Sequence, residues 1–155
     1  MKVAIIMGST SDLPKVEPAI SILKNYGVEV NVRCLSAHRA HLGLSSFIKE
    51  TETDGTEVII TAAGMAAALP VVVPIGVPIA GSNLDGMDAL LSIVQMPSGI
   101  PVATVAINGS KNAAYLALQI MAIKHSEIKE GLLKERKQME ADAMKANDEV
   151  IEKYK

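Results

Sequence analysis

Cysteine and aromatic residues are scarce in this chain of 155 residues. The one cysteine, Cys34, excludes a disulfide within the chain and predicts a reducing, cytoplasmic setting. One cysteine and three histidines cannot supply a cysteine-rich zinc site. Tryptophan is absent, and one phenylalanine with three tyrosines leaves little material for aromatic surfaces that stack bases or bind sugars.

The chain also lacks an excess of one charge and any long apolar run. Fifteen Lys and Arg against 17 Asp and Glu give a net charge of −2, which is not the basic footprint of a nucleic-acid or polybasic membrane binder. Five apolar residues after Met1-Lys2 are too few for a signal-peptide core, and no window approaches the roughly 20 apolar residues of a membrane span. We therefore expect neither nucleic acid nor a membrane as partner.

Short apolar runs do occur, and they alternate with segments of helical spacing. The continuous runs at 3–7, 58–62 and 75–79 are typical of strands buried on both faces of a parallel sheet. Further strands are predicted at 28–32, near a sheet edge, and at 102–107; helices are predicted at 14–26, around 44–48, and at 84–95 and 110–125. This alternation predicts an α/β fold, a flavodoxin-like three-layer sandwich with a parallel sheet of about five strands.

The C-terminal part combines an apolar helix with a charged one. Because the helix at 110–125 is apolar on nearly every side, we expect a partner subunit to cover the face that its own domain leaves open. Beyond it, apolar residues recur near heptad spacing at Leu132, Met139, Ala143, Ala146 and Val150. We predict an α/β domain at 1–125, a helical arm at 126–155 that packs on another subunit, and a homo-oligomer. A solvated terminal helix that frays is the alternative.

Ligands of such sheets bind beyond the carboxyl ends of the strands, so the loops there are the candidates for chemistry. The first loop, 8–12, joins a buried strand to a helix start, where free N–H groups and the helix dipole favour a phosphate. It has neither the Walker nor the Gly-x-Gly-x-x-Gly pattern. Asp12 would be repelled by phosphate and is better suited to accept hydrogen bonds from ribose hydroxyls. Helix capping by Ser11 or Asp12 is the simpler alternative.

The second loop, 36–41, contains a histidine beside an arginine. Arg39 can hold two phosphate oxygens in its planar fork, and His38 is the side-chain type that transfers protons in both directions near neutral pH. Both could also be plain surface residues. His41 could flank the site, but a metal at His38 and His41 would lack a third ligand. His125 is expected to complement the dipole at the end of its helix.

The third loop, 62–70, is built of small residues with almost no polar side chains. It can offer backbone amides only, which suits a close wall around a planar ligand. A tightly packed crossover would have the same composition.

Four motifs in order extend these observations; they are Met7–Asp12, Ser36–Arg39, Leu84–Pro97 and Gly99–Ile107. Together they resemble the 5-(carboxyamino)imidazole ribonucleotide mutase family of purine biosynthesis, also called the catalytic subunit of phosphoribosylaminoimidazole carboxylase. The resemblance runs from Val3 to about Ile123. It implies a flavodoxin-like nucleotide-binding domain, a homo-octamer, no metal or organic cofactor, and a phosphorylated imidazole ribonucleotide as substrate.

The resemblance also implies a reaction, which moves a carboxylate from the exocyclic nitrogen to a ring carbon of 5-(carboxyamino)imidazole ribonucleotide. The product is 4-carboxy-5-aminoimidazole ribonucleotide. In this family the histidine of the second motif is the general acid/base, which here is His38. The residues implied in substrate binding are Ser9, Ser11, Asp12, Ser36, Arg39 and Gly64.

The chain departs from the family pattern at three places. Ala68 replaces a histidine of the third loop, Ala40-His41 replaces Thr-Pro, and the crossover between Pro70 and Ile75 is about two helical turns shorter. We expect an extended or single-turn link there that opens one wall of the pocket and allows some uncoupled decarboxylation. Direct carboxylation of aminoimidazole ribonucleotide by carbon dioxide and a catalytically weakened nucleotide-binding homologue are the alternatives. A receiver-domain role fits less well, because the acidic cluster after the first strand is missing.

Overall fold

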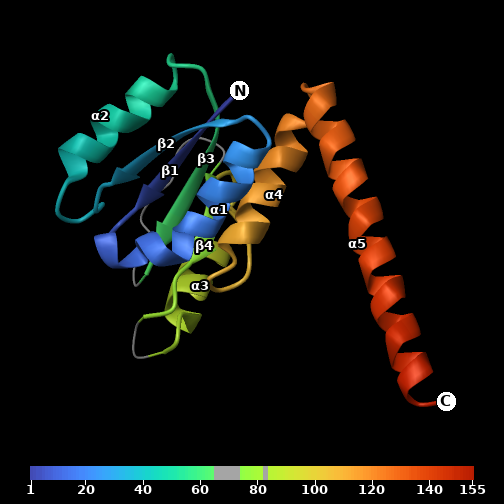
Figure 1. Cartoon of the computed structure of the whole chain (residues 1–155). Coiled ribbons are helices and arrows are strands. Elements are labelled where there is room, and N and C mark those ends of the chain that lie inside the picture. The colour runs from blue at the N-terminus through green and yellow to red at the C-terminus, as the bar shows by residue number, and fades with distance from the viewer. Residues whose placement is uncertain (65–73, 82–83) are drawn as a thin grey trace. The chain divides into compact units, whose positions relative to one another are not determined.

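A five-stranded parallel sheet forms the centre of the computed structural model, which describes residues 1–64, 74–81 and 84–155 (Figure 1). Its strands are β1 (Lys2–Met7), β2 (Glu29–Cys34), β3 (Thr56–Ala63), β4 (Pro74–Pro78) and β5 (Ala103–Thr104). They are ordered β2-β1-β3-β4-β5, and every pairing is parallel. This is the strand order of flavodoxin-like folds, so the predicted fold class is confirmed.

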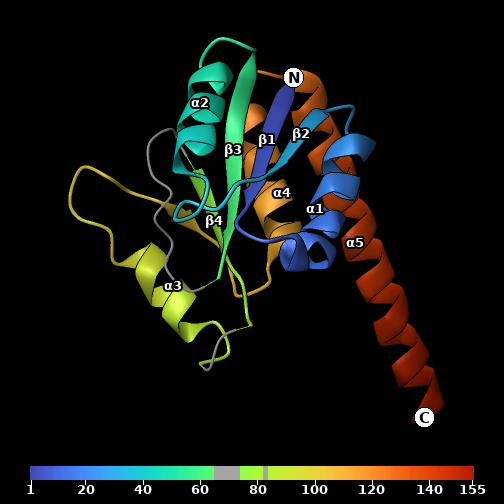
Figure 2. The same ribbon diagram turned by 90° about the vertical axis from the view of Figure 1, so that its left-hand side faces the viewer.

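Helices cover both faces of the sheet. The helical elements along the chain are the 3₁₀ turn η1 (Thr10–Asp12), α1 (Leu13–Asn25), α2 (His41–Thr51), α3 (Met87–Val94), α4 (Ser110–Met121) and α5 (Ser126–Lys153). Helix α2 lies on one face and α1 on the other (Figures 1 and 2). Leu44 and Phe47 of α2 form a core cluster with Ala4, Ile6 and Ile59 of the sheet. Apolar side chains are therefore buried on both sides of β1 and β3, as the continuous apolar runs predicted.

The edge position of β2 also follows the prediction. Its valines, Val30 and Val32, are only half-buried, and the strand pairs with β1 alone among the described strands. Alternating polar residues are expected on a strand with one partly solvated face.

Two elements are shorter than their apolar patterns indicated. The strand predicted at 102–107 is only Ala103–Thr104, and the chain reaches a left-handed conformation at Asn108 (φ +57°). The helix predicted at 84–95 begins only at Met87, because Asp85 (φ +51°) and Gly86 (φ +88°) form a left-handed turn before it. A Cβ atom at Gly86 would lie 3.1 Å from the Cα atom of Ala80, so this turn needs glycine.

The predicted helix at 110–125 ends early. Helix α4 stops at Met121, and His125 occupies the N-cap position of α5, with its Nδ1 atom 3.8 Å from Oε1 of Glu127. The prediction that His125 complements a helix C-terminal dipole is therefore wrong, because His125 lies at a helix N-terminus. Contacts within the chain divide it into two compact units, 1–117 and 118–155.

Candidate active site

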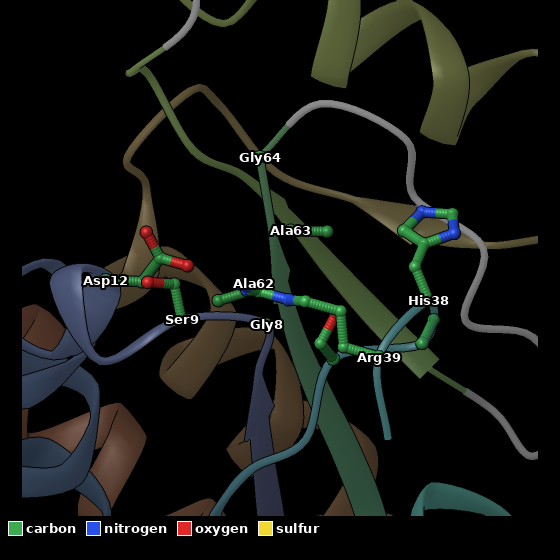
Figure 3. A pocket seen from close by; sticks show the side chains of 10 residues that line it. Gly8, Ser9, Asp12, His38, Arg39, Ala62, Ala63 and Gly64 are labelled. Carbon is green, nitrogen blue, oxygen red and sulfur yellow. The ribbon is translucent and has the colours of Figure 1, made fainter. Parts of the chain in front are cut away.

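A cavity of about 370 Å³ opens at the carboxyl ends of β1, β2 and β3 (Figure 3). The first and second loops singled out in the sequence meet around it with the described start of the third loop, 62–64. Its lining residues are Gly8, Ser9, Asp12, Ser36, Ala37, His38, Arg39, Ala62, Ala63 and Gly64. The cavity thus lies where the topology of an open parallel sheet places a ligand.

Six of the seven predicted site residues line this cavity. They are Ser9, Asp12, Ser36, His38, Arg39 and Gly64. The seventh, Ser11, is exposed and does not line it, but its hydroxyl donates a hydrogen bond of 2.8 Å to the Ser9 hydroxyl oxygen. Ser11 therefore lies behind Ser9, where it can orient that hydroxyl.

The first loop is shaped by Ser9. Its Oγ atom accepts a hydrogen bond of 3.3 Å from the backbone N–H of Ser11 and so caps η1. The capping alternative named Ser11 or Asp12, yet the Asp12 side chain makes no capping hydrogen bond to α1. Instead the Asp12 carboxylate lines the cavity, where it can accept hydrogen bonds from a ligand.

The second loop forms a turn closed by the 2.8 Å hydrogen bond from the Ala40 N–H to the Ser36 carbonyl. Within this turn the Nε atom of Arg39 lies 3.5 Å from the Ser36 hydroxyl oxygen. Figure 3 shows Ser9 and Asp12 on one side of the cavity, His38 on the other, and the Arg39 side chain between them. Arg39 is therefore placed to hold an anion between the first and second loops.

Small residues form the floor of the cavity. Ala62 and Ala63 belong to the third loop that the sequence identified as a possible wall, whereas Gly8 and Ala37 were not predicted as lining residues. Gly8 directly follows a predicted strand, and Ala37 lies between two predicted site residues, so these positions could have identified both. Ala68 and the crossover before Ile75 lie outside the described residues.

Two ionisable groups with clearly altered pKa values lie at the opposite, amino end of the sheet. The Nζ atom of Lys2 is 2.6 Å from Oδ2 of Asp54, and the Thr56 hydroxyl donates a 2.6 Å hydrogen bond to Oδ1 of the same carboxylate. The hydrogen bond from Lys2, followed by that from Thr56, lowers the pKa of Asp54 to about 2. The pKa of Lys2 is raised in turn by its hydrogen bond to Asp54. This pair joins the starts of β1 and β3 and so belongs to the fold.

Within residues 1–64, 74–81 and 84–155, no three His, Cys, Asp or Glu side chains gather as metal ligands would. His41 begins α2, is exposed, and does not line the cavity beside His38. No helix of this part of the chain is long and apolar enough to cross a membrane.

Comparisons with known proteins give a consistent picture. The family model described as AIR carboxylase matches residues 2–142. The chain is 52% identical over 145 residues to the N5-carboxyaminoimidazole ribonucleotide mutase of Pyrococcus abyssi, covering 89% of this chain and 83% of that protein. It is 48% identical over 150 residues to the mutase of the same name from Saccharolobus solfataricus, covering 92% and 95%. The crystal structure of Treponema denticola PurE is similar in fold, with a TM-score of 0.80, 34% identity, and coverage of 95% and 94%.

Proposed function

The chain belongs to the AIR carboxylase family, and from this we propose that it acts as an N5-carboxyaminoimidazole ribonucleotide mutase in purine biosynthesis. The relatives from Pyrococcus abyssi and Saccharolobus solfataricus have that name, and the chain matches most of the length of each. The observation that carries the proposal is the cavity itself, which gathers a histidine, an arginine, hydroxyls and a carboxylate in one place.

Substrate binding is divided among the three loops. The ribose phosphate is held by Arg39 with the hydroxyls of Ser9 and Ser36, while the Asp12 carboxylate accepts hydrogen bonds from the ribose hydroxyls. The small floor at 62–64 lets the flat imidazole ring approach the backbone closely. Bound in this way, the ring lies within reach of the loop that carries His38.

The chemistry then needs one group that gives and takes a proton. The bond between the exocyclic nitrogen and the carboxyl carbon breaks, carbon dioxide is released, and the nitrogen takes a proton from the His38 imidazolium. The electron-rich ring carbon attacks carbon dioxide to form the new carbon–carbon bond. Its own proton passes to the His38 imidazole, which restores the starting state of the enzyme. A closed pocket keeps carbon dioxide near the ring between the two steps.

One experiment separates this reaction from the alternatives. The purified chain is supplied with the carboxyamino ribonucleotide alone, or with the amino ribonucleotide and bicarbonate, and consumption of each is followed. We expect the first to be consumed. Consumption of only the second would establish direct carboxylation, which Ala68 in place of the family's histidine makes the second candidate. Consumption of neither, with nucleotide binding intact, would mean a binding protein.

The assembly and location are part of the same proposal. We propose the homo-octamer that the resemblance implies, with α5 packing on other subunits, and the cytoplasmic location predicted from the single cysteine. Support for the first comes from α5, whose apolar residues Met139, Met144, Val150 and Ile151 are about half exposed in the single chain.

A further inference from the structure

Two side chains hold the main chain just beyond the carboxyl end of β4. The backbone N–H of Ala80 donates a 3.0 Å hydrogen bond to Oδ1 of Asn108, and the Ala80 carbonyl accepts one from the Lys15 ammonium. Asn108 also donates its own N–H to the Pro78 carbonyl at 2.8 Å. We call Lys15, Asn108 and the Ala80 peptide groups that they bind the β4 clamp.

The clamp holds β4 beyond the point where its pairing with β5 ends. Strand β5 pairs with β4 only at Ala103–Thr104, and the chain beyond it turns to the left-handed conformation at Asn108. Asparagine tolerates that conformation better than most residues, and its side-chain amide can imitate a backbone partner. Asn108 thereby supplies to Ala80 the acceptor that a longer β5 would have supplied.

The clamp is connected to both walls of the proposed active site. On one side, the N–H of Ile79 donates a 3.0 Å hydrogen bond to the carbonyl of Ala63, which lines the cavity with Gly64. On the other side, Lys15 lies in the first turn of α1, directly after the loop that ends at Asp12. Lys15 therefore links the helix behind the first loop to the strand beside the third loop.

We propose that Lys15 and Asn108 are positioning residues of this active site, which fix the distance between the wall at Ser9–Asp12 and the wall at Ala63–Gly64. This inference rests on the proposed function. Neither residue lines the cavity, so both act through the backbone of Ala80, Asn108 at its N–H and Lys15 at its carbonyl. Since the two walls carry substrate-binding groups and His38 lies on the second loop, loosening the clamp should weaken substrate binding more than it slows the chemical step.

Asn108 offers a matched pair of variants. Asn108→Gly keeps the left-handed backbone but removes the acceptor, whereas Asn108→Asp keeps an acceptor oxygen for the Ala80 N–H. We expect the glycine variant to raise KM for the carboxyamino ribonucleotide about tenfold with kcat changed less than about twofold. The aspartate variant should restore the wild-type KM. Equal KM values for both variants and the wild type, with only a lowered unfolding temperature in the glycine variant, would overturn the proposal.

Lys15 has its own control in Lys111, which lines a separate cavity together with Lys15. Lys15→Met should raise KM as Asn108→Gly does, whereas Lys111→Met removes a charge from that cavity and leaves the Ala80 carbonyl bonded. Because Lys15 and Asn108 act through one residue, Ala80, the double variant should lose less than the product of the two single effects. If Lys15→Met and Lys111→Met changed KM equally, Lys15 would act only through its charge, and the proposal that it positions Ala80 would be wrong.

Amide hydrogen exchange tests the clamp without any turnover. In Asn108→Gly the N–H groups of Ile79 and Ala80 should exchange faster, and in Asn108→Asp they should exchange as in the wild type. Unchanged protection in the glycine variant would overturn the clamp even if the enzyme is active. If the wild-type chain converts no carboxyamino ribonucleotide, the proposed function fails, and hydrogen exchange still decides whether the clamp holds these strands.

Discussion

Two adjacent residues of the second loop, His38 and Arg39, are assigned different tasks, and single substitutions can separate them. Replacing His38 with asparagine keeps a polar side chain of similar shape but removes its ability to exchange a proton. We expect kcat to fall by about 10² to 10⁴ or more while nucleotide binding survives. Steady-state turnover and calorimetric binding of the substrate measure the two effects separately.

His41 provides the control for that substitution. It is a histidine three residues away that does not line the cavity. His41→Asn should therefore behave as the wild type does. If His38→Asn kept its turnover, or if both variants lost it equally, the proposed proton transfer by His38 would be wrong.

Arg39 is expected to act on binding. Its guanidinium lies between the first and second loops, with Nε 3.5 Å from the Ser36 hydroxyl. Arg39→Ala should weaken nucleotide binding by about 2 kcal/mol, which is roughly thirtyfold in Kd, because a charge-assisted contact to phosphate is lost. Titration calorimetry with the substrate measures this change. An unchanged Kd would place the phosphate elsewhere.

Most of the site could be predicted at this scale because chemistry-bearing side chains follow strand ends. Ser9 and Asp12 follow a strand that its continuous apolar run identifies, and His38 and Arg39 follow one that its alternating valines identify. The role of Asn108 could not be predicted, because it depends on a left-handed backbone and on a partner 28 residues earlier in the chain. Sequence spacing carries no signal for such a contact.

Among the elements, the turn before α3 depends on one glycine. Gly86 has φ +88°, and a Cβ atom there would meet the Ile107 side chain at 2.9 Å as well as the Ala80 backbone. Gly86→Ala should lower the free energy of unfolding by roughly 1 to 3 kcal/mol, because the left-handed conformation is strained for alanine. Denaturant unfolding measures this loss.

Gly43 offers an opposite control within α2. Its added Cβ atom would make an ordinary contact of 3.5 Å with Leu35, and Gly43 lies in the first turn of the helix, where alanine is preferred to glycine. Gly43→Ala should therefore stabilise the chain by about 0.5 to 1 kcal/mol. A loss of equal size in both variants would mean that the glycines matter for a reason other than backbone conformation.

The Lys2–Asp54 pair predicts how stability depends on pH. The folded-state pKa of Asp54 is lowered from 3.8 to about 2, so its contribution is fully present above pH 3.8 and is lost as the pH falls through about 2. Compared with Asp54→Asn, the wild type should be more stable above about pH 4, and the difference should shrink towards pH 2. Unfolding curves recorded between these pH values measure it.

Glu52, an exposed carboxylate in the same connection between α2 and β3, provides a control for Asp54. Glu52→Gln removes a carboxylate two residues before Asp54 without disturbing the contact to Lys2. Its stability should follow the wild-type pH profile. A constant difference between Asp54→Asn and the wild type over the whole range would show that the ion pair does not couple protonation to folding.

The apolar pattern of the sequence predicts which helices and strands exist, but it does not predict where they end. The runs that became β1, β3 and β4 were found because strands buried on both faces are continuously apolar. The ends of β5, α3 and α4 were not predicted because they are set by left-handed residues and by the turn at 122–124 before His125. Apolar residues continue through these breaks, so periodicity alone extends each element too far.

For the whole molecule, α5 is the element that we expect other subunits to cover. The chain ends in this 28-residue helix, most of which is exposed in the single chain. We predict a homo-octamer, with a mass by light scattering of about eight times the 16.4 kDa of one chain. A scattering mass of 16.4 kDa at micromolar concentration would refute any stable oligomer.

The heptad-like spacing of Met139, Ala143, Ala146 and Val150 identifies the face of α5 that should meet another helix. Ala143 lies on this face and Ala141 lies off it, and both are exposed in the single chain. Ala143→Lys places a charge in the helix contact and should lower the mass of the assembly, whereas Ala141→Lys has the same cost in helix propensity and should leave the mass unchanged. Light scattering of both variants at equal concentration measures the difference. If both assemble as the wild type does, α5 is a solvated terminal helix and the subunits meet elsewhere, for example on the exposed part of α4.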